Sequence, residues 1–123
     1  MIQNFRDFEA GADPFGDTWK VRFGWLQTAI AIRHSDSVDV KYFLSNGREE
    51  IERVVALMHP DLLVLSAELG RPLTDSWCMK LAALHLQHMI ETGEDFDRTL
   101  VTVAPGQLRR YAAILEEVAA PER

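Results

Sequence analysis

Two histidines three positions apart are the residues best suited to chemistry in this sequence. His85 and His88 lie in an apolar run with helical periodicity, so both imidazoles would project from one side of a helix. Two imidazoles at this spacing can share a metal ion if another part of the chain supplies a third ligand, such as His59, Cys78 or Glu91. We retain His85, His88 and His59 as the candidate metal ligands. The alternative is a pair of neutral core or interface histidines, hydrogen-bonded to the backbone or to an acid.

The single cysteine is the other candidate reactive group. Cys78 lies near the start of the predicted helix, where the helix dipole would lower the pKa of its thiol. Its neighbours Trp77 and Met79 are apolar, so a small buried side chain is the favoured interpretation. An enzyme with scattered residues would instead draw on the polar loop residues Arg33, His34, Asp36 and His59. No spacing predicts catalytic residues, and the sequence favours a protein that is not an enzyme and offers no sign of a cofactor.

Two short strings match known motifs but lack the required context. Residues 59–61 (HPD) match the tripeptide with which J-domains engage their chaperone, yet the segment before them is mixed in charge and a strand pattern lies upstream. A helix start led by proline explains them better. Residues 95–99 (DFDRT) match a string of phosphoryl-transferring aspartate enzymes, whose first aspartate follows a buried strand. Here a helix precedes it, which favours a solvated acidic loop.

The first half of the chain has the alternation that is typical of strands. Over residues 18–33 the apolar phase changes at Gly24, where we expect a β-bulge, and residues 38–44 alternate in the same way. Residues 18–45 are therefore predicted to form an antiparallel hairpin. The alternation places Trp19, Val21, Phe23 and Trp25 on one strand face. That face is either a core packed against helices or a contact face for a ligand or partner.

Residues 46–58 fit two different elements. Asn46-Gly47 is typical of a type I′ hairpin turn and would be followed by a third strand through Val55 and Leu57. The spacing of Val54, Val55 and Met58 also fits a helix. Two strands alone are marginally stable in water, whereas three strands with an apolar face are not. The strand is therefore favoured.

Helices are expected in the second half. One follows Pro60 and ends at Gly70, a second spans residues 75–92 between a Thr74 cap and Gly93, and a last helix begins at Pro105. Residues 99–103 could form a short edge strand. The helix over 75–92 is apolar nearly all round, with a polar edge made only of Ser76, Lys80, Gln87 and Glu91. Such a helix must be buried on several sides.

These elements predict one α+β domain over residues 1–123. An antiparallel hairpin or three-stranded meander packs against about three C-terminal helices. The expected parts are an irregular N-terminal arm (1–17), a mainly β segment (18–57) and a mainly helical segment (60–119). Phe5, Phe8 and Phe15 are expected to anchor the arm to the core.

Charge and composition narrow the class of function. The chain has 13 Lys+Arg and 19 Asp+Glu, a formal net charge of -6, which disfavours nucleic acid as the partner. One cysteine allows no internal disulfide, and no signal peptide or membrane span is apparent, so we expect a cytoplasmic protein without a membrane partner. A small chain has limited means of covering its central helix, which predicts a homodimer. The leading hypothesis is a non-catalytic interaction or scaffolding domain that self-associates, with a further protein partner possible; a protein that binds a metal or small ligand is the alternative.

Overall fold

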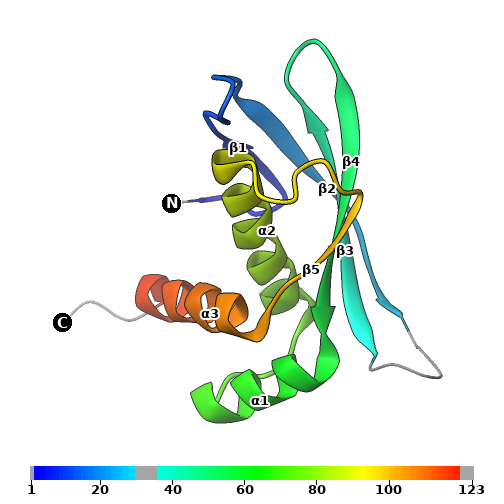
Figure 1. Ribbon diagram of the computed structural model, residues 1–123. Helices are drawn as coiled ribbons and strands as arrows, with labels where there is room; N and C mark the ends of the chain where they lie inside the picture. The colour runs from blue at the N-terminus through cyan, green and yellow to red at the C-terminus, as the bar shows by residue number, and fades with distance from the viewer. Residues whose placement is uncertain (1, 30–35, 120–123) are drawn as a thin grey trace.

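The computed structural model describes residues 2–29 and 36–119 of the 123-residue chain. It confirms the predicted α+β class, because the N-terminal part forms a sheet and the C-terminal part contributes three helices (Figure 1). Four strands form an antiparallel meander in chain order: β1 (Asp7–Ala10), β2 (Trp19–Ala29), β3 (Ser37–Ser45) and β4 (Glu50–Met58). A fifth strand, β5 (Leu100–Thr102), lies parallel to β4 at the far edge.

The predicted hairpin, the third strand and the short edge strand are all present in this sheet. The prediction of an irregular arm over residues 1–17 is wrong for β1, which pairs with the first four residues of β2. In β1, Phe8 and Ala10 turn inward while Asp7 and Glu9 stay exposed, so the strand covers one edge of the core. Phe15 does not anchor the arm, because 91% of it is exposed at the tip of a turn.

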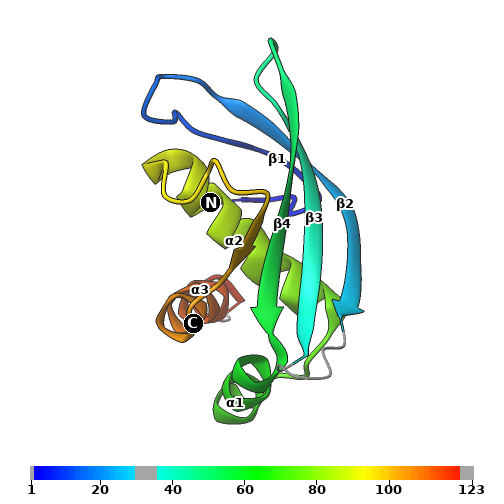
Figure 2. The ribbon, with the colours of Figure 1, turned by 45° about the vertical axis from the view of Figure 1, so that its right-hand side comes forward.

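Three helices lie on one side of the sheet (Figure 2). Helix α1 (His59–Leu69) follows β4 directly, α2 (Asp75–Thr92) crosses the sheet, and α3 (Pro105–Ala119) contacts α1 and α2. The Thr74 side chain caps α2 by accepting a hydrogen bond from the Trp77 N–H at 3.1 Å, as its sequence predicts. Gly93 ends α2 with a φ of 78°, a conformation that glycine adopts readily.

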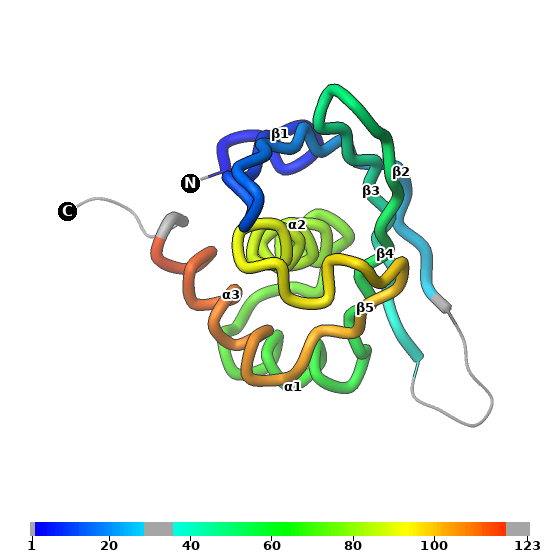
Figure 3. Tube along the Cα trace, turned by 45° about the horizontal axis from the view of Figure 1, so that its top comes forward, coloured from blue at the N-terminus to red at the C-terminus, as the bar shows by residue number. Residues whose placement is uncertain are grey.

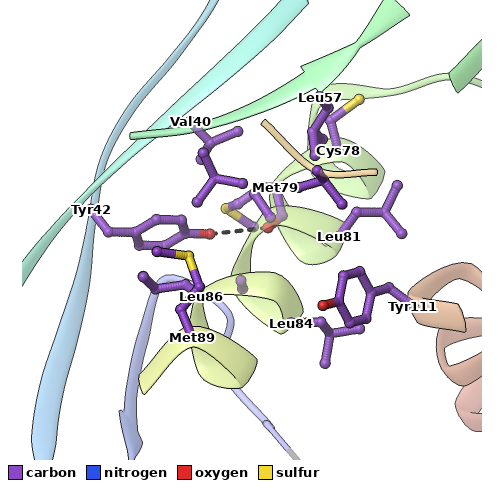
Figure 4. Packing of buried hydrophobic residues seen from close by; sticks show 14 of the residues in the cluster. Val40, Tyr42, Leu57, Cys78, Met79, Leu81, Leu84, Leu86, Met89 and Tyr111 are labelled. Atoms are coloured by element: carbon purple, nitrogen blue, oxygen red, sulfur yellow. Dashed lines mark hydrogen bonds between the residues drawn. The ribbon is translucent and has the colours of Figure 1, made fainter. Parts of the chain in front are cut away.

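The core lies between α2 and the inner face of the sheet. Eleven of the 18 residues of α2 are buried, in agreement with its apolar periodicity. From the sheet side, the Tyr42 hydroxyl donates a hydrogen bond of 3.0 Å to the Met79 carbonyl, within a cluster of aliphatic side chains (Figure 4). Helix α2 lies at the centre of the molecule, packed between the sheet and α3 (Figure 3). The chain therefore covers this helix by itself, and the reason given for a second copy falls away.

Candidate interaction surface

The side of the sheet opposite the helices is an open surface, which we call the outer face. Along β3, the residues that face the helices are buried and the alternate residues are half-exposed. None of the described helices packs on this side (Figure 2). The outer face carries basic, aromatic and acidic side chains: Lys20, Arg22 and Trp25 on β2, Lys41 and Phe43 on β3, Glu50, Glu52 and Val54 on β4, and Leu100 on β5.

A bulge in β2 places Trp25 on this face. The register with β3 shifts between Phe23 and Trp25, so Phe23 faces the core while Trp25 turns outward with 36% of its surface exposed. The bulge confirms the expectation at Gly24, but the prediction that Trp25 shares a face with Trp19 is wrong. One extra residue in a strand moves every later side chain to the opposite face.

Gly24 also makes room for the ring of Phe43. A Cβ atom at Gly24 would lie 2.7 Å from Cε2 of Phe43, closer than two carbon atoms can approach. The absence of a side chain at this position lets the phenyl ring approach the backbone of the bulge. The bulge and the ring therefore form one unit of the outer face.

Cations lie over both exposed rings. The Lys41 ammonium is 5.7 Å from the centre of the Trp25 ring and 5.4 Å from that of Phe43, and the Arg22 guanidinium is 5.4 Å from Phe43. Lys41 also forms an ion pair of 2.9 Å with Glu52. Exposed cation–π contacts contribute roughly 0.5–1 kcal/mol each, so these side chains hold one another in place more than they stabilise the fold.

The outer face contains a hollow of about 570 Å³ at the start of β4, next to the β3–β4 turn. Its basic wall comes from β2, its acidic wall from β4, and Phe43 lies between them. The lining side chains from these strands and β1 are Asp7, Lys20, Arg22, Phe43, Glu50 and Glu52. This arrangement suits a partner surface that also carries both signs of charge.

A second hollow, of about 370 Å³, lies between the 11–18 turn and the loop after α2. Its polar groups serve the fold. The buried Asp13 carboxylate accepts hydrogen bonds of 2.9 Å from the Phe15 N–H, the Asp17 N–H and the Trp19 indole N–H, and these bonds lower its pKa. Arg53 donates through Nε to the Phe96 carbonyl at 2.8 Å, and burial lowers the pKa of its guanidinium. Asp13 therefore fixes the turn to the start of β2, and Arg53 fixes the loop to β4.

The two predicted histidines of α2 lie side by side. The rings of His85 and His88 stack with centres 6.1 Å apart, and Nδ1 of His85 is 2.8 Å from the Tyr111 hydroxyl. Nε2 of His88 is 2.8 Å from a carboxylate oxygen of Glu94. Burial, with a smaller contribution from the charge of His88, lowers the pKa of His85 to about 4, so its ring is neutral near pH 7. The Nε2 atom of His85 is buried without a hydrogen-bond partner in the described part of the chain.

The third predicted metal ligand is not part of this pair. His59 begins α1 at the end of β4, whereas His85 and His88 lie in the half of α2 that runs away from α1 (Figure 1). Within residues 2–29 and 36–119, no three His, Cys, Asp or Glu side chains are grouped so that they could hold a metal ion. The metal site stays a prediction that this geometry does not favour.

The remaining reactive candidates are dispersed or buried. Cys78 is 2% exposed, and burial, assisted by the charge of Asp75, raises the pKa of its thiol to about 11, which suits a structural side chain. Arg33 and His34 lie outside the described residues. The His59 N–H donates a hydrogen bond of 2.9 Å to the Asp36 carbonyl, so these two loop candidates are neighbours.

Searches of protein-family models, curated proteins and solved structures found no match to this chain. The site must therefore be judged on its own geometry. No helix in the described ranges is both long and apolar enough to cross a membrane. Besides Trp25 and Leu100, the large exposed apolar side chains of the described residues are Phe15 on its turn and Leu63, Val64 and Leu69 on α1.

Sequence reasoning missed the outer face as a unit, although one signal for it was present. Alternation placed Lys20 and Arg22 opposite the core side chains, and the phase change at Gly24 was visible. Applied to Trp25 itself, that phase change moves the indole to the same side as the two cations. The position of Phe43 beside them depends on strand pairing, which no local pattern reveals.

Proposed function

We propose that the protein is a non-catalytic interaction domain that self-associates through the outer face of its sheet. The observation that carries this proposal is the bulge that turns Trp25 outward, next to Phe43 and beneath Lys41. Trp25 keeps 36% of its surface exposed on a face that none of the described helices covers. Tryptophan and arginine, both present here, are the residue types that contribute most to binding at protein interfaces.

The reactive side chains support a binding function over an enzymatic one. Cys78 is buried with a raised pKa, and His85 is buried and neutral near pH 7. A cysteine nucleophile must be an exposed thiolate, and a general base must lie within reach of the substrate whose proton it accepts. The outer face offers instead two rings and paired charges, which are features of a contact surface.

Charge supports a protein partner over a nucleic acid. The net charge of -6 repels a phosphate backbone, and the acids of β4 accompany the cations of β2 on the outer face. A face with both signs of charge suits a protein of similar composition, and a second copy is the simplest such partner. We also propose a cytoplasmic location, since the chain has one thiol and no internal disulfide.

The area of the outer face suits a specific interface. Strands lie about 4.8 Å apart and rise about 3.3 Å per residue, so the three long strands β2, β3 and β4 cover roughly 15 by 30 Å, and the short strands β1 and β5 extend the sheet at its two edges. Stable interfaces bury about 800 Å² of accessible surface on each partner. Side chains that stand up from a sheet of these dimensions can provide that area.

The test is the molar mass of the purified protein across a dilution series, measured by light scattering or sedimentation. We expect twice the 14.0 kDa of one chain at micromolar concentration, and a monomer for Trp25→Ala with an unchanged circular dichroism spectrum. Phe15→Ala is the matched control, because it removes another exposed aromatic side chain away from the outer face and should leave the dimer intact. A wild-type protein that stays at 14.0 kDa over the whole series would contradict the proposal.

A further inference from the structure

We infer that two copies of the chain pack outer face to outer face about a two-fold axis parallel to β3, so that Arg22 of each copy faces Glu52 of the other. This inference rests on the proposed self-association and adds its geometry. It follows from the order of charges across the strands, from the position of the aromatic side chains, and from the symmetry that a closed dimer of one chain requires.

The strand register arranges the outer face in rows, each with one side chain from β2, β3 and β4. The first two rows have a cation on β2 and an acid on β4, with an uncharged residue on β3 between them. The first row is Lys20, Ser45 and Glu50, and the second is Arg22, Phe43 and Glu52. The third row is Trp25, Lys41 and Val54, and it continues to Leu100 on β5.

A two-fold axis above β3 and parallel to it places each row of one copy over the same row of the other copy, in the opposite order. The β2 strand of one copy then lies over β4 of the other at the same height along the strands. Sheets packed in this aligned way keep their strand directions within about 30° and lie about 10 Å apart. The basic side of each copy consequently meets the acidic side of its partner.

Each row then makes complementary contacts. Lys20 of each copy meets Glu50 of the other, and Arg22 of each copy meets Glu52 of the other. The two Phe43 rings pack against each other at the axis. These four long charged side chains extend from each copy into the hollow of about 570 Å³ that they line. The gap between the sheets is thereby filled by ion pairs around a central aromatic contact.

The third row adds the apolar part of the interface. Trp25 of one copy lies over Val54 and the half-exposed Leu100 of the other, at both ends of the row. Lys41 lies at the axis and faces the equivalent lysine of the other copy. Its charge is balanced by the ion pair with Glu52 in the same chain. The interface therefore joins an apolar region at one end to a charged region at the other.

A perpendicular axis in the same plane is less favourable. It would place β2 over β2 and β4 over β4, so that neither the basic nor the acidic residues would meet opposite charges. On β1, Asp7 and Glu9 lie next to Arg22 and Lys20 in the register and reduce the positive charge of that edge. Across the parallel axis, by contrast, the basic residues Lys20 and Arg22 meet the two acids of β4, Glu50 and Glu52.

The test uses two variants that should each be monomeric and should associate when mixed. In Arg22→Glu and in Glu52→Arg, like charges face each other at both symmetry-related contacts, and we expect the dimer dissociation constant to rise by about tenfold or more. In the mixed dimer both contacts pair opposite charges, so an equimolar mixture should recover a 1:1 dimer. Sedimentation of one fluorescently labelled variant with the other measures this recovery.

Controls keep the outcome interpretable. Arg110→Glu makes the same charge change on the exposed side of α3 and should leave the wild-type dimer intact. Since Glu52→Arg also removes the ion pair with Lys41, the pair Lys20→Glu and Glu50→Lys repeats the test without touching it. Thermal melting of each variant verifies folding.

The results separate this inference from the proposed function. If Arg22→Glu and Glu52→Arg each remain dimeric, the two-fold axis is overturned while self-association stands. The same holds if the two variants are monomeric and fail to associate when mixed. A dimer lost on Leu63→Glu but not on Trp25→Ala would move the interface to α1. A wild-type monomer would remove the proposed function itself.

Discussion

The inner and outer faces of one sheet differ in what they do. On β3, Val38, Val40, Tyr42 and Leu44 face α2 and are buried, while the alternating side chains between them are half-exposed. The inner face carries apolar side chains and stabilises the fold by burying them. The outer face carries rings with cations above them, and these cation–π contacts add little to the stability of the fold. The difference shows that the same backbone supplies a core on one side and a surface available to a partner on the other.

The largest effect should come from the inner face. Leu57→Ala removes a side chain that is fully buried against the helices, and we expect the free energy of unfolding to fall by about 2–5 kcal/mol. Urea denaturation measures the change. Val54→Ala, three residues earlier on the same strand but on the outer face, is the matched control and should cost less than about 1 kcal/mol in the monomer. Equal losses for the two variants would contradict the division into faces.

Acid should weaken the helix side of the molecule through a single buried ring. The pKa of His85 is about 4 in the folded protein, below its ordinary value of 6.5, because burial disfavours the charged ring. The unfolded chain therefore binds a proton more readily, and stability is fully present above pH 6.5 and is lost as the pH falls toward 4. The melting temperature of the wild type should follow this slope.

His85→Leu is the variant that isolates this contribution. It removes the titrating group and should flatten the slope between pH 6.5 and 4, while Cys78→Ala, another change on the buried side of α2, should leave the slope in place. An unchanged slope in His85→Leu would assign the acid sensitivity to other groups.

The smallest of these effects should come from the bulge in β2. Gly24→Ala brings a methyl group against the Phe43 ring, and we expect a loss of about 1 kcal/mol as the ring moves aside. Phe43→Ala in the same chain removes the closest contact and leaves the Lys41 carbonyl 3.1 Å from the new Cβ, so the double variant should regain part of that loss. Double-mutant analysis by urea denaturation measures the coupling, and additive effects would show that glycine and ring act independently.

Local patterns in the sequence were sufficient to predict much of the fold. Alternation predicted β2 and β3, and the need of a hairpin for a third strand favoured β4 over a helix. β1 was missed because its four residues are too short for a periodic signal, and its pairing depends on contact with β2. The parallel pairing of β5 was also beyond reach, since it depends on where α1 and α2 return the chain.

The candidate site was less accessible from sequence. Helical spacing brought His85 and His88 together as expected, but the separation of His59 from them is set by the tertiary path of the chain. The apolar helix led to an expected second copy, whereas α2 is covered by its own chain. Surface residues such as Phe43 acquire a role only through neighbours on other strands, which periodicity within one strand cannot reveal.

The parallel strand β5 has a consequence for the order of folding. β1 to β4 each pair with the next strand in the sequence, so these contacts can form as soon as residue 58 has left the ribosome. The pairing of Val54 with Leu100 instead closes a long loop that contains both α1 and α2. Contacts of high sequence separation form slowly. One edge of β4 therefore stays open in the nascent chain until α2 is complete, and β5 closes it last.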